Sequence, residues 1–505
     1  MTRTVDYAVV VPTIGRPSLQ VTLMGLAAQQ HPPSEVVVVD DRRAGGTPLC
    51  VPSALTARCR TRVVTGGARG PATARNLGWQ VTAAQWVVFL DDDVEIPRDW
   101  SARLVSDLAD ADARTAGVQA VVRVPLPDDR PPTDWERNTA ALADARWITA
   151  EMAFRRTALL EVSGFDERFP RAYREDSDLA LRLQNAGWQL RQGNRTVVHP
   201  VRPAGPWISV RAQRGNADDA LMRALHGRSW REAVGAGRGR MRNHLLAVGL
   251  GSIAVGTAPA AHHRWGRRVA VASAAGWVAM TAEFAIRRIL PGPRTPAEIG
   301  RMAVTSALIP WCAVTHAVRG RWRHRTAQPW PLPLRAVLFD RDGTLIVNDE
   351  QPADVAVVHP VEGAAEAVAA LRAHGFATGV VTNQGAVGEG RTTAQDVAVR
   401  NAAVDRALGP FDTWQVCPHR VSEGCSCRKP APGMIRAAAR ALGTPPQQCV
   451  VIGDTAGDLL AARRAGAVDV LVPNADTRRS EVDDAPRVAP DLTAAVKWIL
   501  EGARS

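Results

Sequence analysis

The chain contains almost no lysine. Of its 505 residues 62 are basic, yet only Lys429 and Lys497 are lysines, so arginine carries nearly all of the positive charge. Because arginine is the default basic residue here, an arginine-rich stretch is weak evidence for a special role. A lysine among reactive side chains is correspondingly informative, and Lys429 stands in such a place.

Several recognisable signals are also missing. The first apolar run, residues 5–11, is short, includes Asp6 and reaches Pro12, unlike a secretory signal peptide, so we expect a cytoplasmic N-terminus. No G-x-G-x-x-G stretch is present, which disfavours a dinucleotide-binding domain. No nucleic-acid motif accompanies the positive charge, so we expect no nucleic-acid partner. We find no internal repeat.

The chain is too long for one ordinary hydrophobic core, so two or three domains are expected. Its charge is unevenly placed: residues 1–205 carry a net charge of +1, residues 206–332 carry +14 and residues 333–505 carry −3. With the motifs described below, this predicts an N-terminal α/β domain over 1–205 and a basic, partly apolar helical segment and linker over 206–332. A C-terminal α/β domain with a doubly wound parallel sheet is predicted over 333–505.

Two carboxylates stand at the end of a predicted buried strand. The apolar run 336–339 leads directly into Asp340, and Asp342 follows two residues later. Ligands of open α/β sheets bind at the C-terminal ends of the strands. Asp340 can attack a phosphorus atom, and Asp342 can give a proton to the leaving oxygen. Such close carboxylates are useful only when a cation or their surroundings separate their roles.

Further segments supply what phosphoryl chemistry needs. A second apolar strand ends in a hydroxyl and two amides, including that of Gln384, which suit phosphate oxygens. A later loop supplies fixed positive charge. A third apolar strand ends in a carboxylate, and another carboxylate follows one helical turn beyond it. In chain order these side chains are Thr382, Asn383, Arg428, Lys429, Asp454 and Asp458.

Cysteine and histidine gather immediately before Arg428. The pattern is C-x-H-x5-C-x-C, formed by Cys417, His419, Cys425 and Cys427. Three thiols and one imidazole suit a single tetrahedral Zn²⁺, whereas a disulfide is disfavoured in the cytosol. We expect a structural zinc that stiffens the loop carrying Arg428 and Lys429. The other cysteines show no pairing pattern: Cys50, Cys59, Cys312 and Cys449.

Residues 333–505 resemble the haloacid dehalogenase (HAD) superfamily. The zinc pattern resembles the IIIA branch, which includes D-glycero-D-manno-heptose 1,7-bisphosphate phosphatase and the histidinol-phosphate phosphatase domain. Residues 383–390 and 428–434 look more like the heptose enzyme, while the five-residue zinc-loop spacer is also found in the histidinol type. The resemblance implies an aspartyl-phosphate on Asp340. It implies magnesium ligands Asp340, Asp342 and Asp454, and phosphate or substrate contacts from Thr382, Asn383, Arg428 and Lys429.

An acidic triplet follows a predicted strand in the N-terminal half. Residues 7–13 and 36–41 read as buried parallel strands with a helix from about residue 18 to 30 between them, and the strand 86–90 leads into Asp91, Asp92 and Asp93. Adjacent carboxylates repel one another unless a cation sits there. Mg²⁺ or Mn²⁺ bridging a diphosphate accounts for them, and a ligand-free acidic turn is the alternative.

Residues 5–202 resemble family 2 glycosyltransferases with the GT-A fold. The resemblance implies an inverting transfer from a nucleotide sugar, with Asp176 as the general base and Asp93 as a ligand of Mg²⁺ or Mn²⁺. The implied nucleotide-sugar contacts are Asp40, Asp41, Arg75 and Asp91. His199 is either a further metal ligand or a core histidine. Glu175 is an alternative candidate as a cap or an acceptor contact.

The middle segment contains three apolar runs, 243–261, 269–286 and 302–318, separated by arginine clusters. They are short for spanning helices, which need about 20 apolar residues. Both enzymatic domains need cytosolic substrates, so the chain must cross a membrane an even number of times or not at all. We favour an interfacial helical bundle on an anionic inner leaflet. A two-span hairpin and a soluble helical domain are the alternatives. Trp322, Trp330 and the neighbouring prolines read as a linker.

These patterns favour a cytoplasmic, peripherally membrane-associated enzyme with two activities. A sugar-phosphate phosphatase, for which D,D-heptose 1,7-bisphosphate is the expected substrate, is joined to a nucleotide-sugar glycosyltransferase. The alternative is a histidinol-phosphate-type phosphatase fused to a membrane scaffold that binds nucleotide sugar without turnover. The intact acidic triplet and Asp176 argue against such a scaffold.

Overall fold

The computed structural model describes residues 5–43, 47–237, 239–348 and 354–502. A seven-stranded sheet forms the N-terminal part, in the order β3-β2-β1-β4-β6-β5-β7. Strands β1 to β4 are parallel, β6 runs antiparallel to β4 and β5, and β7 runs parallel to β5. The strands are β1 Tyr7–Thr13, β2 Glu35–Asp40, β3 Arg60–Thr65, β4 Trp86–Leu90, β5 Thr115–Arg123, β6 Glu151–Arg155 and β7 Gln189–Val198.

Side chains that alternate along the strands of this sheet form two hydrophobic cores, one on each face. Val9 packs with one set of apolar residues, whereas the adjacent Val10 packs with another on the opposite face. Helices α1 (Ser18–Ala27) and α4 (Trp100–Ala109) cover the first face, and α3 (Pro71–Gln80) and α7 (Glu175–Asn185) cover the second. The β1–α1–β2 start agrees with the prediction, although α1 ends three residues earlier than expected.

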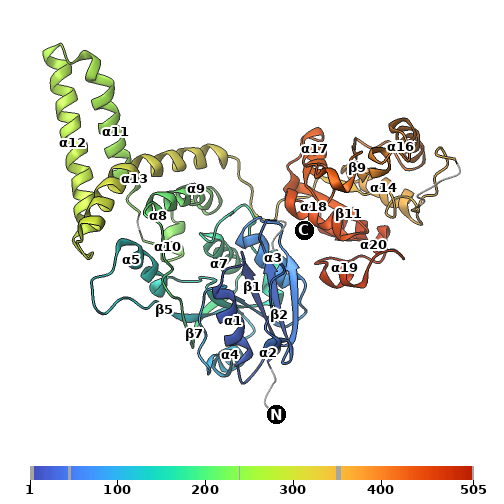
Figure 1. Ribbon diagram of the computed structural model, residues 1–505, viewed down its shortest axis with the longest axis horizontal. Coiled ribbons are helices and arrows are strands. Elements are labelled where there is room, and N and C mark those ends of the chain that lie inside the picture. Colours follow the sequence, from blue (N-terminus) through green and yellow to red (C-terminus); the bar gives the residue numbers. More distant parts are fainter. Residues whose placement is uncertain (1–4, 44–46, 238, 349–353, 503–505) are drawn as a thin grey trace.

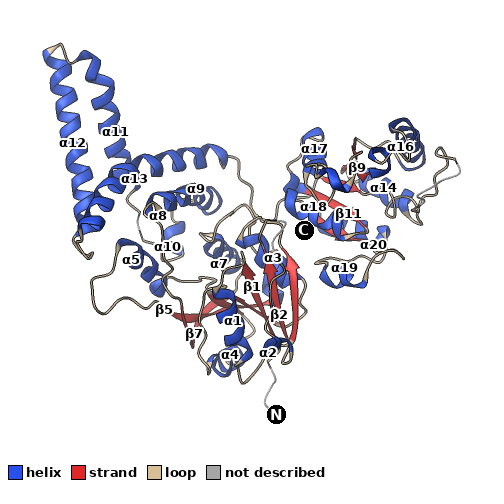
Figure 2. Cartoon of the chain, viewed as in Figure 1, coloured by secondary structure: helices blue, strands red, loops and turns tan. Residues whose placement is uncertain are grey.

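The C-terminal part is a five-stranded parallel sheet in the order β10-β9-β8-β11-β12. Its strands are β8 Ala336–Phe339, β9 Ala377–Asn383, β10 Thr413–Cys417, β11 Cys449–Gly453 and β12 Val468–Leu471. Helices α14 (Ala364–Ala373), α16 (Ala394–Leu408) and α20 (Leu492–Gly502) pack on one face, and α17 (Gly433–Ala441) and α18 (Ala456–Ala465) on the other. The predicted doubly wound α/β class is confirmed (Figure 2).

The three apolar runs of the middle segment form long helices. They are α11 (Met241–Thr257), α12 (Arg264–Ile289) and α13 (Pro296–Arg323). Figure 1 shows α11 and α12 as a hairpin that projects from the rest of the molecule. Helix α13 instead packs along α9 (Gly215–His226), where Gly320 lies so close to Ala217 that any side chain would clash with its backbone. Trp322 lies in the last turn of α13, so its prediction as linker is wrong.

Shorter helices complete the description. They are α2 Ser53–Thr56, α5 Asp134–Ala140, α6 Arg156–Glu161, α8 Ile208–Arg211, α10 Trp230–Ala233, α15 Gly385–Gly388 and α19 Arg479–Asp484. Arg288 of α12 donates to Asp134 of α5 at 2.7 Å, which ties the base of the hairpin to the N-terminal part.

The segment that leads into β8 is fastened to the N-terminal part. The Trp330 indole N–H donates to the Ser163 carbonyl at 2.9 Å, and Arg168 donates to the Gln328 carbonyl at 2.8 Å. Beyond this segment, Arg62 of β3 reaches the Asp483 carbonyl of α19 at 2.5 Å. The two sheets are therefore held side by side (Figure 1).

Candidate active sites and metal centres

The predicted nucleophile lies at the centre of the C-terminal sheet edge. Asp340 follows β8, and the neighbouring strands β9 and β11 end at Asn383 and Gly453, just before Asp454. Topology thus brings the predicted phosphatase residues to one edge. Gly343 in the loop after Asp340 has φ +81°, and an added side chain would meet the Asp454 carboxylate. A glycine is required there because backbone and carboxylate approach so closely.

Lys429 is the cation of this site. Its ammonium group lies 2.8 Å from the Asp340 carboxylate and 2.5 Å from that of Asp458, and it donates to the Val381 carbonyl at 2.9 Å. Only 6% of the residue is exposed. Burial opposes its charge, but Asp340 and Asp458 outweigh burial and raise the pKa of Lys429. It therefore remains a fixed positive charge.

Three carboxylates of this site could share one cation. Oxygens of Asp340, Asp454 and Asp458 lie within 4.8 Å of one another. Burial raises the pKa of Asp340 to about 8 despite Lys429, and burial with the Asp458 charge raises that of Asp454 to about 6. A divalent cation would relieve this repulsion, and carboxylate oxygens suit Mg²⁺. The arrangement brings together two of the three predicted magnesium ligands and adds Asp458.

The Asp342 carboxylate lies outside that group. It accepts hydrogen bonds from Arg341 at 2.9 and 3.1 Å and from the Gln384 amide at 2.8 Å. The same amide donates to the Thr382 hydroxyl at 2.8 Å. These bonds orient Asp342 beside the nucleophile, which suits a proton-transfer role better than metal ligation by its side chain.

Asn383 and Arg428 hold the loop that carries Lys429. The Asn383 amide accepts from the Lys429 N–H at 3.0 Å and donates to the Lys429 carbonyl at 3.1 Å. Arg428 donates to the His419 carbonyl at 3.1 Å. Asn383 therefore positions Lys429 directly, and its predicted contact with phosphate stays a prediction.

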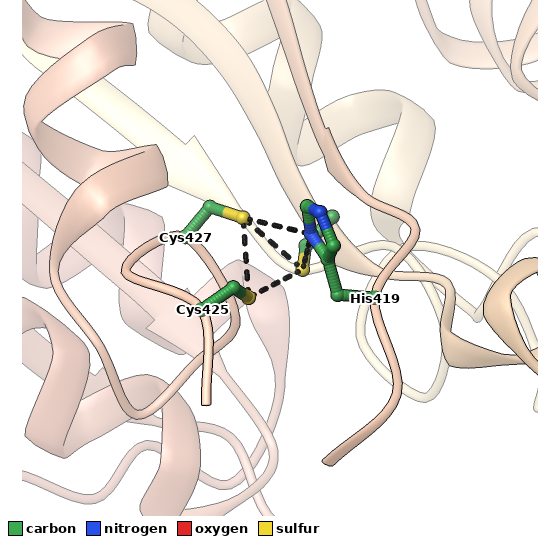
Figure 3. A group of neighbouring side chains, drawn as sticks. His419, Cys425 and Cys427 are labelled. Carbon is green, nitrogen blue, oxygen red and sulfur yellow. Dashed lines mark hydrogen bonds between the residues drawn. The ribbon is translucent and has the colours of Figure 1, made fainter. Parts of the chain in front are cut away.

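The predicted zinc ligands converge (Figure 3). Sulfur–sulfur distances among Cys417, Cys425 and Cys427 are 3.4–3.6 Å, and the His419 Nδ1 atom lies 3.2 Å and 3.5 Å from Cys427 and Cys417. A tetrahedral Zn²⁺ with bonds of about 2.3 Å to sulfur and 2.0 Å to nitrogen spaces its ligands by about 3.6–3.8 Å. The donor set and its spacing fit zinc. The unpaired state of the four other cysteines agrees with the sequence.

A second acidic centre lies at the edge of the N-terminal sheet. Oxygens of Asp91 and Asp93 and a ring nitrogen of His199 lie within 4.8 Å of one another, after β4 and β7. Burial and the Asp91 charge raise the pKa of Asp93. Arg202 forms an ion pair with Asp93 at 2.7 Å and its side chain is half-exposed, so it can move away when a cation binds. This donor set fits Mg²⁺ or Mn²⁺.

Arg75 lies beneath this centre. It is 1% exposed and donates to Asp91 at 2.9 Å and to Glu175 at 2.8 Å. Burial raises the pKa of Glu175 to about 8, the Asp176 charge adds to this, and Arg75 opposes it. Arg75 thus fixes Asp91 from below, and Glu175 belongs to this buried support.

Asp176 has one carboxylate oxygen bonded to the Ser177 N–H at 2.7 Å. Burial raises its pKa, against the opposing charges of Arg75 and Arg174. Arg174 has a left-handed backbone (φ 78°), stacks over Trp230 and donates to Asp219 of α9 at 2.9 Å. The helices after residue 205 therefore support the loop that presents Asp176.

The two carboxylates predicted to hold the nucleoside differ in their surroundings. Asp40 accepts from the Arg42 guanidinium at 2.6 and 2.8 Å, which lowers its pKa. Asp41 is buried, which raises its pKa, and it accepts from the N–H groups of Arg69 and Gly70 at 3.0 and 2.7 Å. Asp41 lines a hollow of about 490 Å³ together with Ile14, Arg42 and Arg43.

Sequence reasoning missed several supporting residues. Asn474 donates to the Asp454 carboxylate at 2.8 Å, and Arg202 pairs with Asp93. Neither stands in a recognisable motif. Arg341, which donates to Asp342, was also missed, although its position between Asp340 and Asp342 could have indicated a role in the site.

Comparison with known proteins identifies two families in the chain. The glycosyl transferase family 2 model matches residues 8–169, and the HAD-hydrolase-like model matches residues 426–495. The chain is thus a fusion of a family 2 glycosyltransferase domain with a HAD-type phosphatase domain.

The relatives of the C-terminal part are more specific. The D-glycero-beta-D-manno-heptose-1,7-bisphosphate 7-phosphatase of Pseudomonas putida is 31% identical over 178 residues, which are 33% of this chain and 100% of the relative. The same enzyme of Bordetella bronchiseptica is 33% identical over 186 residues, 34% of this chain and 100% of the relative. Over this part the chain belongs to that phosphatase family.

One similar solved structure is the D,D-heptose 1,7-bisphosphate phosphatase of B. bronchiseptica complexed with magnesium and phosphate. It is 28% identical, with a TM-score of 0.31, and the match covers 33% of this chain and 99% of that one.

Proposed function

We propose that the C-terminal domain hydrolyses D,D-heptose 1,7-bisphosphate to heptose 1-phosphate and that the N-terminal domain is an inverting nucleotide-sugar glycosyltransferase. The contact of Lys429 with Asp340 and Asp458, beside Asp454, carries the phosphatase proposal. The substrate is inferred from the names of the two relatives that the chain covers in full.

Asp340 acts as the nucleophile. Its carboxylate oxygen attacks phosphorus, the bond from phosphorus to the ester oxygen breaks, and Asp342 gives that oxygen a proton. Asp342 then takes a proton from the water that attacks the aspartyl-phosphate, which releases phosphate and restores Asp340. Lys429 compensates negative charge throughout. Mg²⁺ held by Asp340, Asp454 and Asp458 would supply further charge stabilisation and keep Asp340 ionised.

In the transferase, Asp176 takes the proton of an acceptor hydroxyl, whose oxygen attacks the anomeric carbon as the bond to the diphosphate breaks. This single displacement inverts the anomeric centre. Asp91, Asp93 and His199 would hold Mg²⁺ or Mn²⁺, which neutralises the leaving diphosphate, and Asp40 and Asp41 would bind the nucleoside.

Structural zinc is proposed for the Cys417, His419, Cys425 and Cys427 cluster, because four soft or imidazole donors converge there. Cys427 immediately precedes Arg428 and Lys429 in the chain. Zinc would therefore fix the loop that carries both cations.

Residues 243–318 are proposed to lie on the cytoplasmic face of a membrane. On the hairpin, Leu246, Val255 and Val271 are 62–74% exposed. Helix α12 alone, among the helices described, is long and apolar enough to span a membrane. Arginines at both ends of α12 suit anionic headgroups. Flotation of the full chain with anionic vesicles, but not of a Leu246→Asp/Val271→Asp variant, would support this placement, and absence of flotation would contradict it.

Phosphate release from the purified full chain tests the phosphatase proposal. Heptose 1,7-bisphosphate should be hydrolysed at its 7-phosphate much faster than histidinol phosphate. The reverse preference would favour the histidinol-phosphate alternative. A product assay with nucleotide sugars and Mg²⁺ or Mn²⁺ tests the transferase, and nucleotide-sugar binding without turnover would favour the scaffold alternative.

A further inference from the structure

A cavity of about 910 Å³ lies where three parts of the molecule meet. Loops of the transferase domain that contain Arg69 and Arg171 form one wall, and the last turns of α13 form a second. Helices α17 and α18 of the phosphatase domain form the third, with Arg436 and Arg464. Its size falls within the range of about 300–1,000 Å³ that is usual for small-molecule sites.

The cavity is strongly basic. Nine of its lining residues are arginines, whereas Glu167 and Asp218 are its only acidic lining residues within the described parts of the chain. These two carboxylates are already paired, with Arg69 at 3.0 Å and with Arg171 at 2.5 Å. Across the described residues, six of the arginines have no carboxylate partner: Arg43, Arg214, Arg319, Arg323, Arg436 and Arg464.

The two histidines of the cavity, His316 and His324, are partly buried beside these arginines. Burial, followed by the charges of Arg214, Arg171 and Arg319, lowers the pKa of His316. Burial, followed by the charges of Arg323 and Arg168, lowers the pKa of His324 to about 4. Burial alone lowers the pKa of a histidine, and the arginine charges add to that effect.

Arg319 and Arg323 place two guanidinium groups side by side in the cavity wall. They are one turn apart on α13, so their side chains lie on the same face of the helix. Guanidinium groups in this arrangement suit the oxygens of phosphate, which they bind in pairs. Arg321 lies between them in sequence but projects from another face and does not line the cavity.

We propose that this cavity binds an organic molecule with at least two phosphate groups. It borders the hollow that contains Asp41, with which it shares Arg43 and Arg69. On its other side, Arg464 donates to the carbonyl of Pro430, the residue after Lys429, at 3.0 Å. The ligand thus comes from one of two sources: the nucleoside diphosphate left by sugar transfer, or a sugar bisphosphate on its way to the phosphatase.

Calorimetric binding to the full chain tests this proposal. The probes are inorganic pyrophosphate, ADP and fructose 1,6-bisphosphate, in buffer without divalent cations, because the two acidic centres repel polyanions when no cation is present. We expect one probe molecule per chain. Arg319→Gln/Arg323→Gln should weaken binding about tenfold or more, since two charge-assisted contacts are lost. Arg321→Gln, on the same helix and also exposed, should change the affinity less than about twofold.

Three outcomes would overturn the proposal: no binding of any probe, equal weakening by Arg321→Gln, or unchanged binding in the double variant. Stronger binding of ADP than of the bisphosphate would identify the transfer product as the source, and the opposite order would identify the phosphatase substrate. The replaced side chains are exposed, so the variants should melt within a few degrees of the parent chain, which checks their folding.

Discussion

Asp340 illustrates how a single side chain depends on its neighbours. Its pKa is raised by burial to about 8, while the Lys429 ammonium at 2.8 Å favours the charged form. An asparagine has nearly the same shape but cannot form an acyl phosphate. We expect Asp340→Asn to lower phosphate release by several orders of magnitude without unfolding the domain. The assay is phosphate release by a variant whose zinc content and melting temperature match the parent; near-normal turnover would refute the nucleophile assignment.

The only lysine near either centre offers a finer test. Lys429 contacts two carboxylates and one carbonyl inside a buried pocket, which a compact ammonium can do and a planar guanidinium cannot. Lys429→Arg should therefore lose at least about 100-fold in kcat, although charge is conserved. Lys497→Arg, an exposed site on α20, is the matched control and should keep full activity. Equal activity of the two variants would contradict the argument.

At the scale of elements, the loop between β10 and α17 carries the proposed zinc ligands. We expect about one zinc per chain in protein purified without chelator, measured by elemental analysis. Cys425→Ser should lose the zinc and lower the unfolding temperature of the C-terminal domain, because metal affinity contributes to folding. Cys449→Ser, a buried cysteine outside the cluster, should retain the metal. Zinc-free parent protein would rule the centre out.

Helix α13 ends at the basic cavity, and its C-terminal neighbour His324 should make stability depend on pH. Burial and the nearby Arg323 and Arg168 lower the pKa of His324 in the folded chain to about 4, from the usual 6.5. Between pH 6.5 and 4, His324 is protonated in the unfolded chain but neutral in the folded chain. The free energy of unfolding therefore falls as the pH drops through this range. With screening, the loss is at most about 1–2 kcal/mol.

Denaturant unfolding at several pH values measures this effect. His324→Gln should flatten the dependence between pH 6.5 and 4. His359→Gln, at a position outside the cavity, should leave it in place. A parent chain whose stability does not change over this window would contradict the assignment.

Strand-end chemistry was predictable because parallel strands bring their C-terminal ends together. Asp340, Asn383 and Asp454 meet as expected for that reason. Asp458 and Lys429 also meet, but their 2.5 Å contact depends on the angle of α18, which apolar periodicity does not determine. Asn474 and Arg202 reach their carboxylates from loops, and no local pattern marks such residues. The wrong assignment of Trp322 has the same origin, since packing of α13 on α9 extended the helix into an arginine-rich stretch.

For the whole molecule, the two centres should work independently. Asp93 and Asp340 follow strands of separate sheets and belong to separate groups of candidate cation ligands. Asp93→Ala should abolish sugar transfer but change phosphate release less than about tenfold, since couplings between sites are typically about 1–3 kcal/mol. Asp176→Ala should act similarly while retaining donor binding. Both activities are measured on each variant at saturating Mg²⁺. Loss of phosphatase activity in well-folded Asp93→Ala would mean that the N-terminal half is part of the phosphatase site.

The hydrogen bond from Trp330 to Ser163 limits how far the two catalytic domains can separate. Only residues 331–335 separate that anchor from β8, so the tether spans at most about 18 Å when fully extended. Two catalytic domains joined by such a short linker stay at an effective concentration in the millimolar range relative to each other, whatever the concentration of the protein.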